Sequence, residues 1–350
     1  MRRLGWLRRL RLLLVAPALL LLATTLASAD SGADHQTTQT PPISLGTSGG
    51  NINDISKAFC YGGTLGALVS QTDGTQYILS NNHVLARLNR ATSGEDIIQP
   101  GLIDVSCRGN RANTVADLSA FVTILFKSKR TMPTNTVDAA IALVRGGQVQ
   151  TDGRILDIGT ISGVTAQDQV GCAVEKSGRT TGLTTGTITA VDVTVDINYG
   201  NGKFARFTDQ FLIGSGSFSA AGDSGSLVVT VPPAGGTPSA VGLLFAGSSS
   251  STIANPIGSV LSLLGVQMVG SGTGTDCPEP SPALAAATAA KGRHEQALLH
   301  IPDVAGVGVG RGGAIEVYLA RDNAQSRARI PAQLDGVPVR VVVTGEFQAR

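Results

Sequence analysis

Short runs of apolar residues recur from about residue 52 to residue 269, and Gly, Asn, Asp or Ser separates each run from the next. The run 186–195 contains nine residues, 187–195, in which apolar and polar side chains alternate, as in a half-buried β-strand. The other strand-like runs cover residues 65–69, 77–80, 118–126, 139–144 and 227–231. No long helical period interrupts the series, so the pattern predicts a mainly β domain over residues 52–269.

The composition changes after this region. Gly, Ser and Pro dominate the first part of residues 270–290 and Ala the second, and we interpret this stretch as a linker. Residues 291–350 predict a small α/β appendage, to which we assign no chemistry and for which a protein partner is one expected role. The expected elements are a helix over about 282–299, strands over 304–311 and 314–320 around Gly312-Gly313, a short helix over 322–329 and a strand over 337–344.

The first 29 residues have the pattern of a secretory signal peptide. A basic start precedes an apolar run over residues 12–26, and an Ala-Ser-Ala site ends at Ala29. We predict cleavage after Ala29 and a secreted or extracytoplasmic protein. The alternative is an uncleaved membrane anchor over residues 12–29, a length at the lower limit for spanning a bilayer. The polar residues 30–51 are interpreted as a flexible leader or pro-segment.

Composition excludes several classes of protein. Of the 350 residues, 42% are hydrophobic, which is too much apolar surface for a disordered chain. Five of the 27 basic residues lie in the expected signal peptide, which leaves 22 basic against 25 acidic residues in the rest. This balance lacks the basic surface that nucleic-acid binding requires. We expect no nucleic-acid partner, and membrane contact only through the signal peptide.

The cysteines are four in number: Cys60, Cys107, Cys172 and Cys277. An even number in an exported chain predicts two disulfides, with three possible pairings. We prefer a Cys107–Cys172 pair, because both residues lie in the β domain. No Cys-x-x-Cys pair occurs and the histidines are scattered, so we expect neither a metal nor another cofactor.

Histidine is scarce, and His83 is the single histidine between residues 36 and 293. It follows directly after the predicted strand 77–80, in the sequence Leu-Ser-Asn-Asn-His-Val-Leu-Ala. The end of a strand on a rigid scaffold is a suitable place for a general base. A structural histidine is the alternative for this residue taken alone.

A candidate nucleophile, Ser224, lies in the sequence Gly-Asp-Ser-Gly-Ser that begins at Gly222. Acyl transfer needs a hydroxyl beside backbone N–H groups that stabilise an oxyanion, and the flanking glycines allow the required backbone. The string alone is weak evidence, because Ser48 in Gly-Thr-Ser-Gly matches it in the expected leader.

Asp138 precedes the apolar run 139–144. A carboxylate at the head of a buried strand is costly unless it is paired or hydrogen-bonded. An imidazole N–H is a suitable partner, and the carboxylate would then hold the ring in one orientation. Asp104 and Asp117 are competing candidates in more polar surroundings.

The order His83, Asp138, Ser224, with separations of 55 and 86 residues, resembles the chymotrypsin/trypsin-like serine peptidases in a bacterial exported form. The resemblance covers about residues 52–269. It implies two six-stranded β-barrels with the three residues in the cleft between them. It also implies hydrolysis of peptide bonds in protein or peptide substrates through an acyl-enzyme. The N–H groups of Gly222 and Ser224 would form the oxyanion hole.

The resemblance has departures at the specificity pocket. Trypsin-like members carry an acidic residue six positions before the nucleophile, whereas Phe218 stands here. The expected wall strand, which contains Phe245 and Gly247, is apolar. We therefore expect no selectivity for Lys or Arg and a preference for apolar or small side chains.

Activation and activity have alternatives as well. In many relatives a new N-terminus pairs with the acid before the nucleophile, and Ile43 lies at about the distance from His83 that this switch requires. Many bacterial relatives lack the switch. A non-enzymatic alternative for the whole chain is a protease-fold binding or scaffold protein whose appendage recruits a partner.

Overall fold

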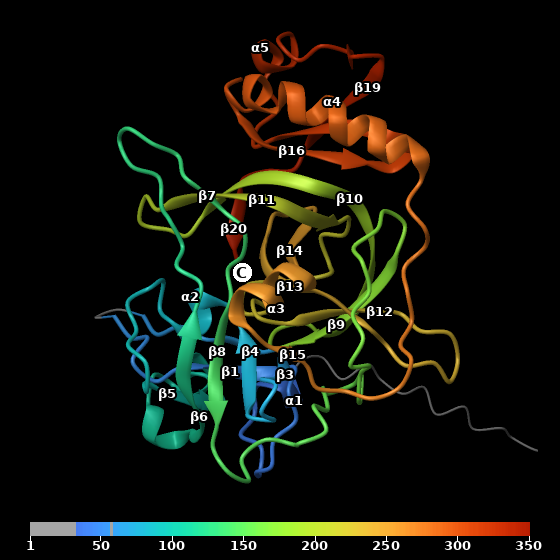
Figure 1. Cartoon of the computed structure of the whole chain (residues 1–350). Coiled ribbons are helices and arrows are strands. Elements are labelled where there is room, and N and C mark those ends of the chain that lie inside the picture. Colours follow the sequence, from blue (N-terminus) through green and yellow to red (C-terminus); the bar gives the residue numbers. More distant parts are fainter. Residues whose placement is uncertain (1–32, 57–58) are drawn as a thin grey trace, which may run out of the picture.

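The structure is a computed structural model that describes residues 33–56 and 59–350. The expected signal peptide, residues 1–29, lies outside the described residues. Two β-barrels stack on one another and the C-terminal α/β segment lies on the second barrel (Figure 1). The mainly β class that the hydrophobic pattern predicts is confirmed.

The first barrel closes through six strands. Its sheet runs in the order β15-β3-β4-β8-β6-β5-β1-β2, and Gly66 joins the ends β2 and β3 into one bent strand. The short strand β15 is added beside β3. The bounds are β1 (Thr47–Asn51), β2 (Gly63–Leu65), β3 (Ala67–Ser70), β4 (Gln76–Ser80), β5 (Asp96–Gln99), β6 (Asn113–Phe121), β8 (Ala140–Val144) and β15 (Gln267–Met268). Short helical turns at α2 (Asn82–Leu85), η1 (Leu102–Val105) and η2 (Gly109–Arg111) connect them.

The second barrel also closes through six strands, in the order β10-β9-β12-β13-β14-β11, because β11 pairs back with β10. Every residue of β13 is buried, which explains its unbroken apolar sequence. The bounds are β9 (Ala173–Gly178), β10 (Gly182–Asn198), β11 (Phe204–Ile213), β12 (Leu227–Thr230), β13 (Ala240–Gly247) and β14 (Thr252–Pro256), with β7 (Thr134–Asn135) beside β11 and helix α3 (Ile257–Leu264) after β14. The two six-stranded barrels implied by the resemblance are therefore present.

The residues expected to form a flexible leader are part of the first barrel from residue 33 onward. His35, in the short helix α1 (Ala33–Gln36), is buried and bonds the carbonyl of Gly46 at 2.7 Å. Ile43 and Leu45 are fully buried, and β1 is a barrel strand. The polar appearance of this segment was misleading, because its Ser, Thr and Asn side chains find hydrogen-bond partners inside the barrel.

The C-terminal segment extends the second barrel instead of standing apart from it. Strand β16 pairs with β10, and Gly306 lies so close to β10 that an added Cβ would be 2.7 Å from the carbonyl of Thr194. The segment's elements match the expected helix and strands to within a few residues. They are α4 (Pro282–Leu299), β16 (Val304–Gly310), η3 (Arg311–Gly313), β17 (Ala314–Leu319), α5 (Ala324–Arg327), β18 (Gln333–Leu334), β19 (Val337–Val343) and β20 (Phe347–Ala349).

Two disulfides join Cys60 to Cys107 and Cys172 to Cys277. The expected number is confirmed, whereas the preferred Cys107–Cys172 pairing is wrong. Cys107 belongs to the first barrel and bonds Cys60 of the same barrel. Cys172 directly precedes β9 of the second barrel and bonds Cys277, in the segment before α4. Two disulfides are consistent with an extracytoplasmic location.

Candidate active site

The structure brings His83 against Asp138 at the surface between the barrels. Strand β4 ends at Ser80, and the amide of Asn81 donates a 2.7 Å hydrogen bond to the carbonyl of Asp138, which ties the two loops together. His83 Nδ1 lies 2.6 Å from Asp138 Oδ2, and the backbone N–H of His83 donates to Oδ1 at 3.2 Å. The Asp138 side chain is fully buried and the His83 side chain is 13% exposed.

The surroundings of His83 raise the pKa of its imidazole. Burial lowers the pKa of the ring, but the charge and hydrogen bond of Asp138 raise it more, helped by the carbonyl of Arg350 and the charge of Asp54. The net pKa of His83 therefore lies above its ordinary value. Asp138 is thus placed to hold the ring orientation and to stabilise an imidazolium.

The competing acids have other partners. Asp104 accepts two hydrogen bonds from the guanidinium of Arg179, at 2.6 and 2.8 Å, and Asp117 pairs with Arg145. Ser48, the second match to the glycine–serine string, is buried in β1 and donates to Asp104. Within the described residues, no hydrogen bond joins Asp104, Asp117 or Ser48 to His83.

Tyr199 is a residue of this site that the sequence did not reveal. It follows β10, in the hairpin between β10 and β11, and its hydroxyl donates a 2.8 Å hydrogen bond to Asp138 Oδ2. Burial, and then the Asp138 carboxylate, raise the pKa of Tyr199 well above the ordinary value, so the group is a permanent donor. No local signal could have found this contact, because 61 residues separate the partners.

Ser224 lies on a tight loop of the second barrel. Gly222 and Gly225 on either side have φ of 101° and 92°, a backbone that favours glycine. The loop touches the first barrel at Gly66, where an added Cβ would be 1.9 Å from the carbonyl of Gly225. The backbone of Thr64 also donates to the carbonyl of Ser224 at 2.7 Å. Contacts between barrels therefore hold this loop in place.

The Ser224 hydroxyl donates to the carbonyl of Phe245 at 3.3 Å, and within the described residues no hydrogen bond joins it to His83. The nearest partner of His83 Nε2 is the carbonyl of Arg350, at 3.4 Å, while the backbone N–H of Arg350 donates to the same Phe245 carbonyl at 3.1 Å. Arg350 thus links the two residues: its carbonyl contacts His83, and its N–H shares an acceptor with Ser224. The backbone N–H groups of Gly222 and Ser224 have no hydrogen-bond acceptor among residues 33–56 and 59–350.

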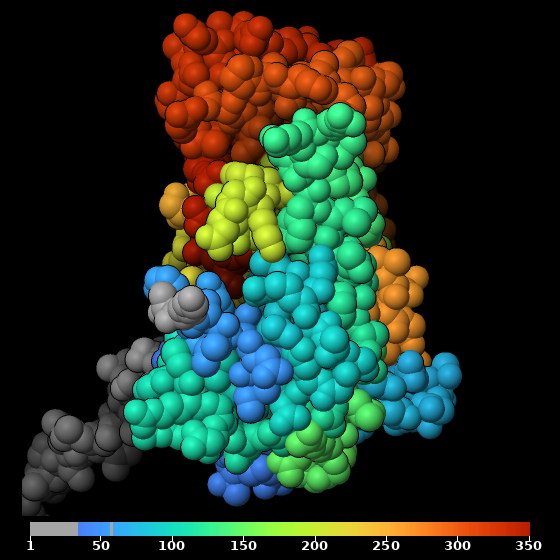
Figure 2. Space-filling model, turned by 90° about the vertical axis from the view of Figure 1, so that its left-hand side faces the viewer, coloured from blue at the N-terminus to red at the C-terminus, as the bar shows by residue number. Residues whose placement is uncertain are grey.

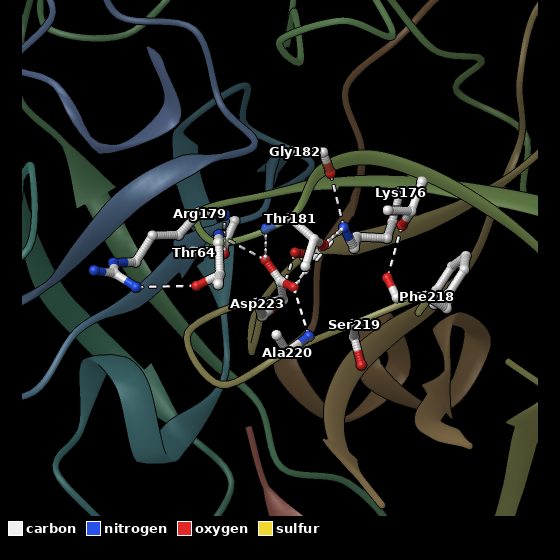
Figure 3. A network of polar contacts seen from close by, with 12 residues as sticks. Thr64, Lys176, Arg179, Thr181, Gly182, Phe218, Ser219, Ala220 and Asp223 are labelled. Atoms are coloured by element: carbon white, nitrogen blue, oxygen red, sulfur yellow. Dashed lines mark hydrogen bonds and ion pairs between the residues drawn. The ribbon is translucent and has the colours of Figure 1, made fainter. Parts of the chain in front are cut away.

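Asp223 is the centre of a buried polar network (Figure 3). Its carboxylate accepts from the N–H groups of Thr180, Thr181 and Ala220 and from the Thr181 hydroxyl, at 2.8 to 3.2 Å. Lys176 Nζ lies 3.9 Å away, and both side chains are fully buried. Burial lowers the pKa of Lys176 to about 8 against the opposing effect of Asp223.

This network surrounds the acid with which a new N-terminus would pair, in the alternative that includes an activation switch. Ile43 is fully buried, and its N–H donates to the carbonyl of Gln148 at 2.8 Å. The charge opposite Asp223 comes instead from Lys176, which belongs to strand β9. The loop that carries Ser224 is therefore held in shape without a new N-terminus at Ile43.

A cavity of about 620 Å³ opens between the barrels. It is lined by residues of both, among them His83, Tyr61, Tyr199, Gly222 and Arg350. Phe218 and Phe245 are fully buried in hydrophobic clusters of the second barrel and do not line it. Gly247 pairs with Gln348, so the strand expected as a pocket wall is covered by the chain's own C-terminal residues.

Among residues 33–56 and 59–350, no three His, Cys, Asp or Glu side chains gather as metal ligands would. No described helix combines the length and the apolar character needed to cross a membrane.

Comparisons with known proteins bear on the fold. The model of the Nal1 C-terminal domain matches residues 134–255, about a third of the chain, which span Asp138 and Ser224. No curated protein sequence matches the chain.

Bacterial serine proteases are among the solved structures with similar folds. A glutamic-acid-specific serine protease with a histidine triad for substrate binding is 21% identical, over 65% of this chain and 100% of that chain, with a TM-score of 0.43. Thermobifida fusca protease A is 19% identical, over 65% and 99%, with a TM-score of 0.42. Cellulomonas bogoriensis chymotrypsin is 16% identical, over 65% and 99%, also at 0.42. The likeness concerns the fold, and the chain is similar to chymotrypsin-like bacterial serine proteases.

Proposed function

We propose that the protein is a secreted serine endopeptidase that hydrolyses peptide bonds through an acyl-enzyme. The observation that supports this most strongly is the arrangement around Arg350. The imidazole of His83 contacts its carbonyl, and Ser224 Oγ and the Arg350 N–H share the Phe245 carbonyl as acceptor. A peptide bound in the same way would have its carbonyl beside His83 and its N–H on the carbonyl that Ser224 also contacts.

In this mechanism His83 removes the proton of Ser224 and later delivers it to the leaving amine. Asp138, held by its bond to Tyr199, keeps the ring in the tautomer that presents Nε2 to the hydroxyl. The Gly222 and Ser224 N–H groups donate to the oxyanion of the tetrahedral intermediate. Ser224 must rotate from the Phe245 carbonyl toward His83 before it can react.

The experiment compares residues 30–350 with the Ser224→Ala variant in fluorophosphonate labelling and in cleavage of casein and peptide libraries. Triad residues act together, so we expect the substitution to abolish labelling and to reduce the cleavage rate on the order of 10⁶-fold. The library profile also tests the expected preference for apolar or small side chains and the role of Phe218. A folded wild-type protein that is neither labelled nor active would contradict the proposal.

A second candidate is a silent protease-fold scaffold. One observation favours it, namely that Ser224 donates to Phe245 and not to His83. In that case the Ser224→Ala variant would retain the biological activity of the protein, including any recruitment of a partner by residues 291–350.

A further inference from the structure

The last four residues of the chain leave the C-terminal segment and enter the cleft between the barrels. Strand β20 pairs in parallel with β10, Ile197 opposite Phe347, and antiparallel with β13, Gly247 opposite Gln348 and Ala246 opposite Ala349. The label C lies between the two barrels in Figure 1. Dark red atoms of this end of the chain show in the hollow beside the yellow hairpin in Figure 2.

The pairing with β13 is that of a bound peptide. Recognition by strand addition uses main-chain hydrogen bonds to an exposed strand, and β13 supplies the strand here. The pairing ends with the N–H of Arg350 on the carbonyl of Phe245, at 3.1 Å, beside Ser224. The Arg350 carbonyl then faces His83 Nε2 at 3.4 Å. Residues 347–350 thus run toward Ser224 as the acyl part of a substrate would.

We infer that residues 347–350 are an intramolecular inhibitor that occupies the acyl side of the substrate cleft. This inference rests on the proposed peptidase function and adds a mode of regulation to it. A substrate must displace the segment before its own backbone can pair with β13. Because the competitor is tethered, its effective concentration is in the millimolar range, which raises the apparent KM.

Phe347 anchors the segment, whereas Arg350 at its end is held less firmly. Phe347 is fully buried, and its ring packs edge-on against Tyr318 with centroids 6.1 Å apart, so the segment is anchored in the appendage. Arg350 is held less well. Its guanidinium donates to the carbonyl of Ser248, but its Nε is buried without a partner. An end with an unsatisfied donor is suited to reversible displacement.

The inhibitor covers only part of the cleft. The cavity beside it is lined by Tyr61, Arg87 and Arg90 as well as by residues 348–350. The leaving-group side of a substrate would bind there, and it is open in this state. The segment therefore competes with a substrate for the acyl side of the cleft alone.

The test compares the full chain with a deletion of residues 348–350, which keeps the Phe347 anchor. Gln348→Pro serves as a second variant at full length, because proline removes the N–H that the antiparallel pairing uses. Gln325→Ala, an exposed change on α5, is the control. We expect both cleft variants to lower KM by about tenfold or more with little change in kcat, and to speed fluorophosphonate labelling. The hexapeptide Gly-Glu-Phe-Gln-Ala-Arg should inhibit the deletion variant competitively.

The outcomes separate this inference from the proposed function. Equal KM and equal labelling rates in the full chain, the deletion variant and Gln348→Pro would overturn the inference that residues 347–350 inhibit. The proposed peptidase function would be unaffected. No labelling in any chain would remove the peptidase. Amide hydrogen exchange of Ala246 and Gly247, measured in the inactive Ser224→Ala background, then tests whether residues 347–350 are docked on β13. Exchange that is faster after the deletion supports a docked segment, and unchanged exchange contradicts it.

Discussion

The Asp138 carboxylate is held from several sides, and each contact limits what the His83 ring can do. The ring of His83 and the Tyr199 hydroxyl both contact Oδ2, while the backbone N–H of His83 donates to Oδ1. These hydrogen bonds hold the carboxylate in one orientation against the imidazole. Orientation of the imidazole is therefore shared between the two barrels, because Tyr199 belongs to the second and Asp138 to the first.

Replacing Tyr199 by Phe tests its positioning role. The Tyr199→Phe variant loses a hydrogen bond to a charged group, worth about 1.5–3 kcal/mol. We expect kcat to fall about tenfold or more, with KM little changed. Asp138 becomes a stronger electrostatic partner of His83, so the acid limb of the kcat/KM profile should move to higher pH.

The matched control is Tyr77→Phe, whose hydroxyl bonds Gln71 away from the site. A Tyr199→Phe enzyme with an unchanged pH profile and unchanged kcat would show that the tyrosine has no positioning role.

The lowered pKa of Lys176 predicts an alkaline limb in the pH profile of activity. The pKa of Lys176 is lowered to about 8 by burial, so its ammonium group faces Asp223 below that pH and is lost above it. Loss of the charge leaves the Asp223 carboxylate with only its N–H and hydroxyl donors, which changes the electrostatic field at the Ser224 loop, while the fold is stabilised by releasing this proton. Activity should fall as the pH rises above about 8. Lys176→Met should lower activity across the pH range and destabilise the fold by about 3–5 kcal/mol.

Steady-state rates from pH 6 to 10, together with urea unfolding, measure both effects, and the exposed Lys129→Met is the control. Wild-type activity of the Lys176→Met variant at pH 7 would refute this role for the lysine.

At the scale of elements, the contact of the bent strand β2–β3 with the Ser224 loop positions the nucleophile. Gly66 leaves room for the carbonyl of Gly225, which a Cβ would meet at 1.9 Å. The Gly66→Ala variant must push the loop away. We expect a loss of about 1–3 kcal/mol in stability and a much slower labelling of Ser224.

Gly146→Ala provides the comparison, since nothing lies within 4 Å of its added Cβ. Thermal unfolding and labelling rates measure both changes. Normal labelling by Gly66→Ala would mean that the loop tolerates the displacement.

Sequence reasoning located most elements but not their partners. The run 139–144 and the alternating run 186–195 correspond to strands β8 and β10, because burial on one or both faces leaves a local pattern. Residues 33–51 carry no such pattern, and their place in the first barrel was missed. The joining of β16 to β10 was also missed, since strand neighbours far apart in sequence leave no local signal.

At the scale of the molecule, the disulfide Cys172–Cys277 fastens the segment before α4 to the second barrel across 105 residues. A cross-link over a loop of this length restricts the unfolded chain by about 4–5 kcal/mol. The Cys172→Ser/Cys277→Ser variant should unfold at a markedly lower temperature. Because β20 lies beyond this link, its release from the cleft should also become easier, seen as a lower KM.

Calorimetry and kinetics on the double variant measure these effects, with the Cys60→Ser/Cys107→Ser variant as a comparison in the first barrel. Unaltered KM with a lowered unfolding temperature would show that the disulfide supports stability alone.

The sequence by itself determined the β class, the number of disulfides, and the order of His83, Asp138 and Ser224 along the chain. These features follow from local patterns, from composition and from the scarcity of histidine. The tertiary structure alone decided the disulfide pairing, the Tyr199 and Lys176 contacts and the entry of residues 347–350 into the cleft. Such contacts join residues up to 267 positions apart, as His83 and Arg350 are. Only the closing of both barrels brings them within bonding distance.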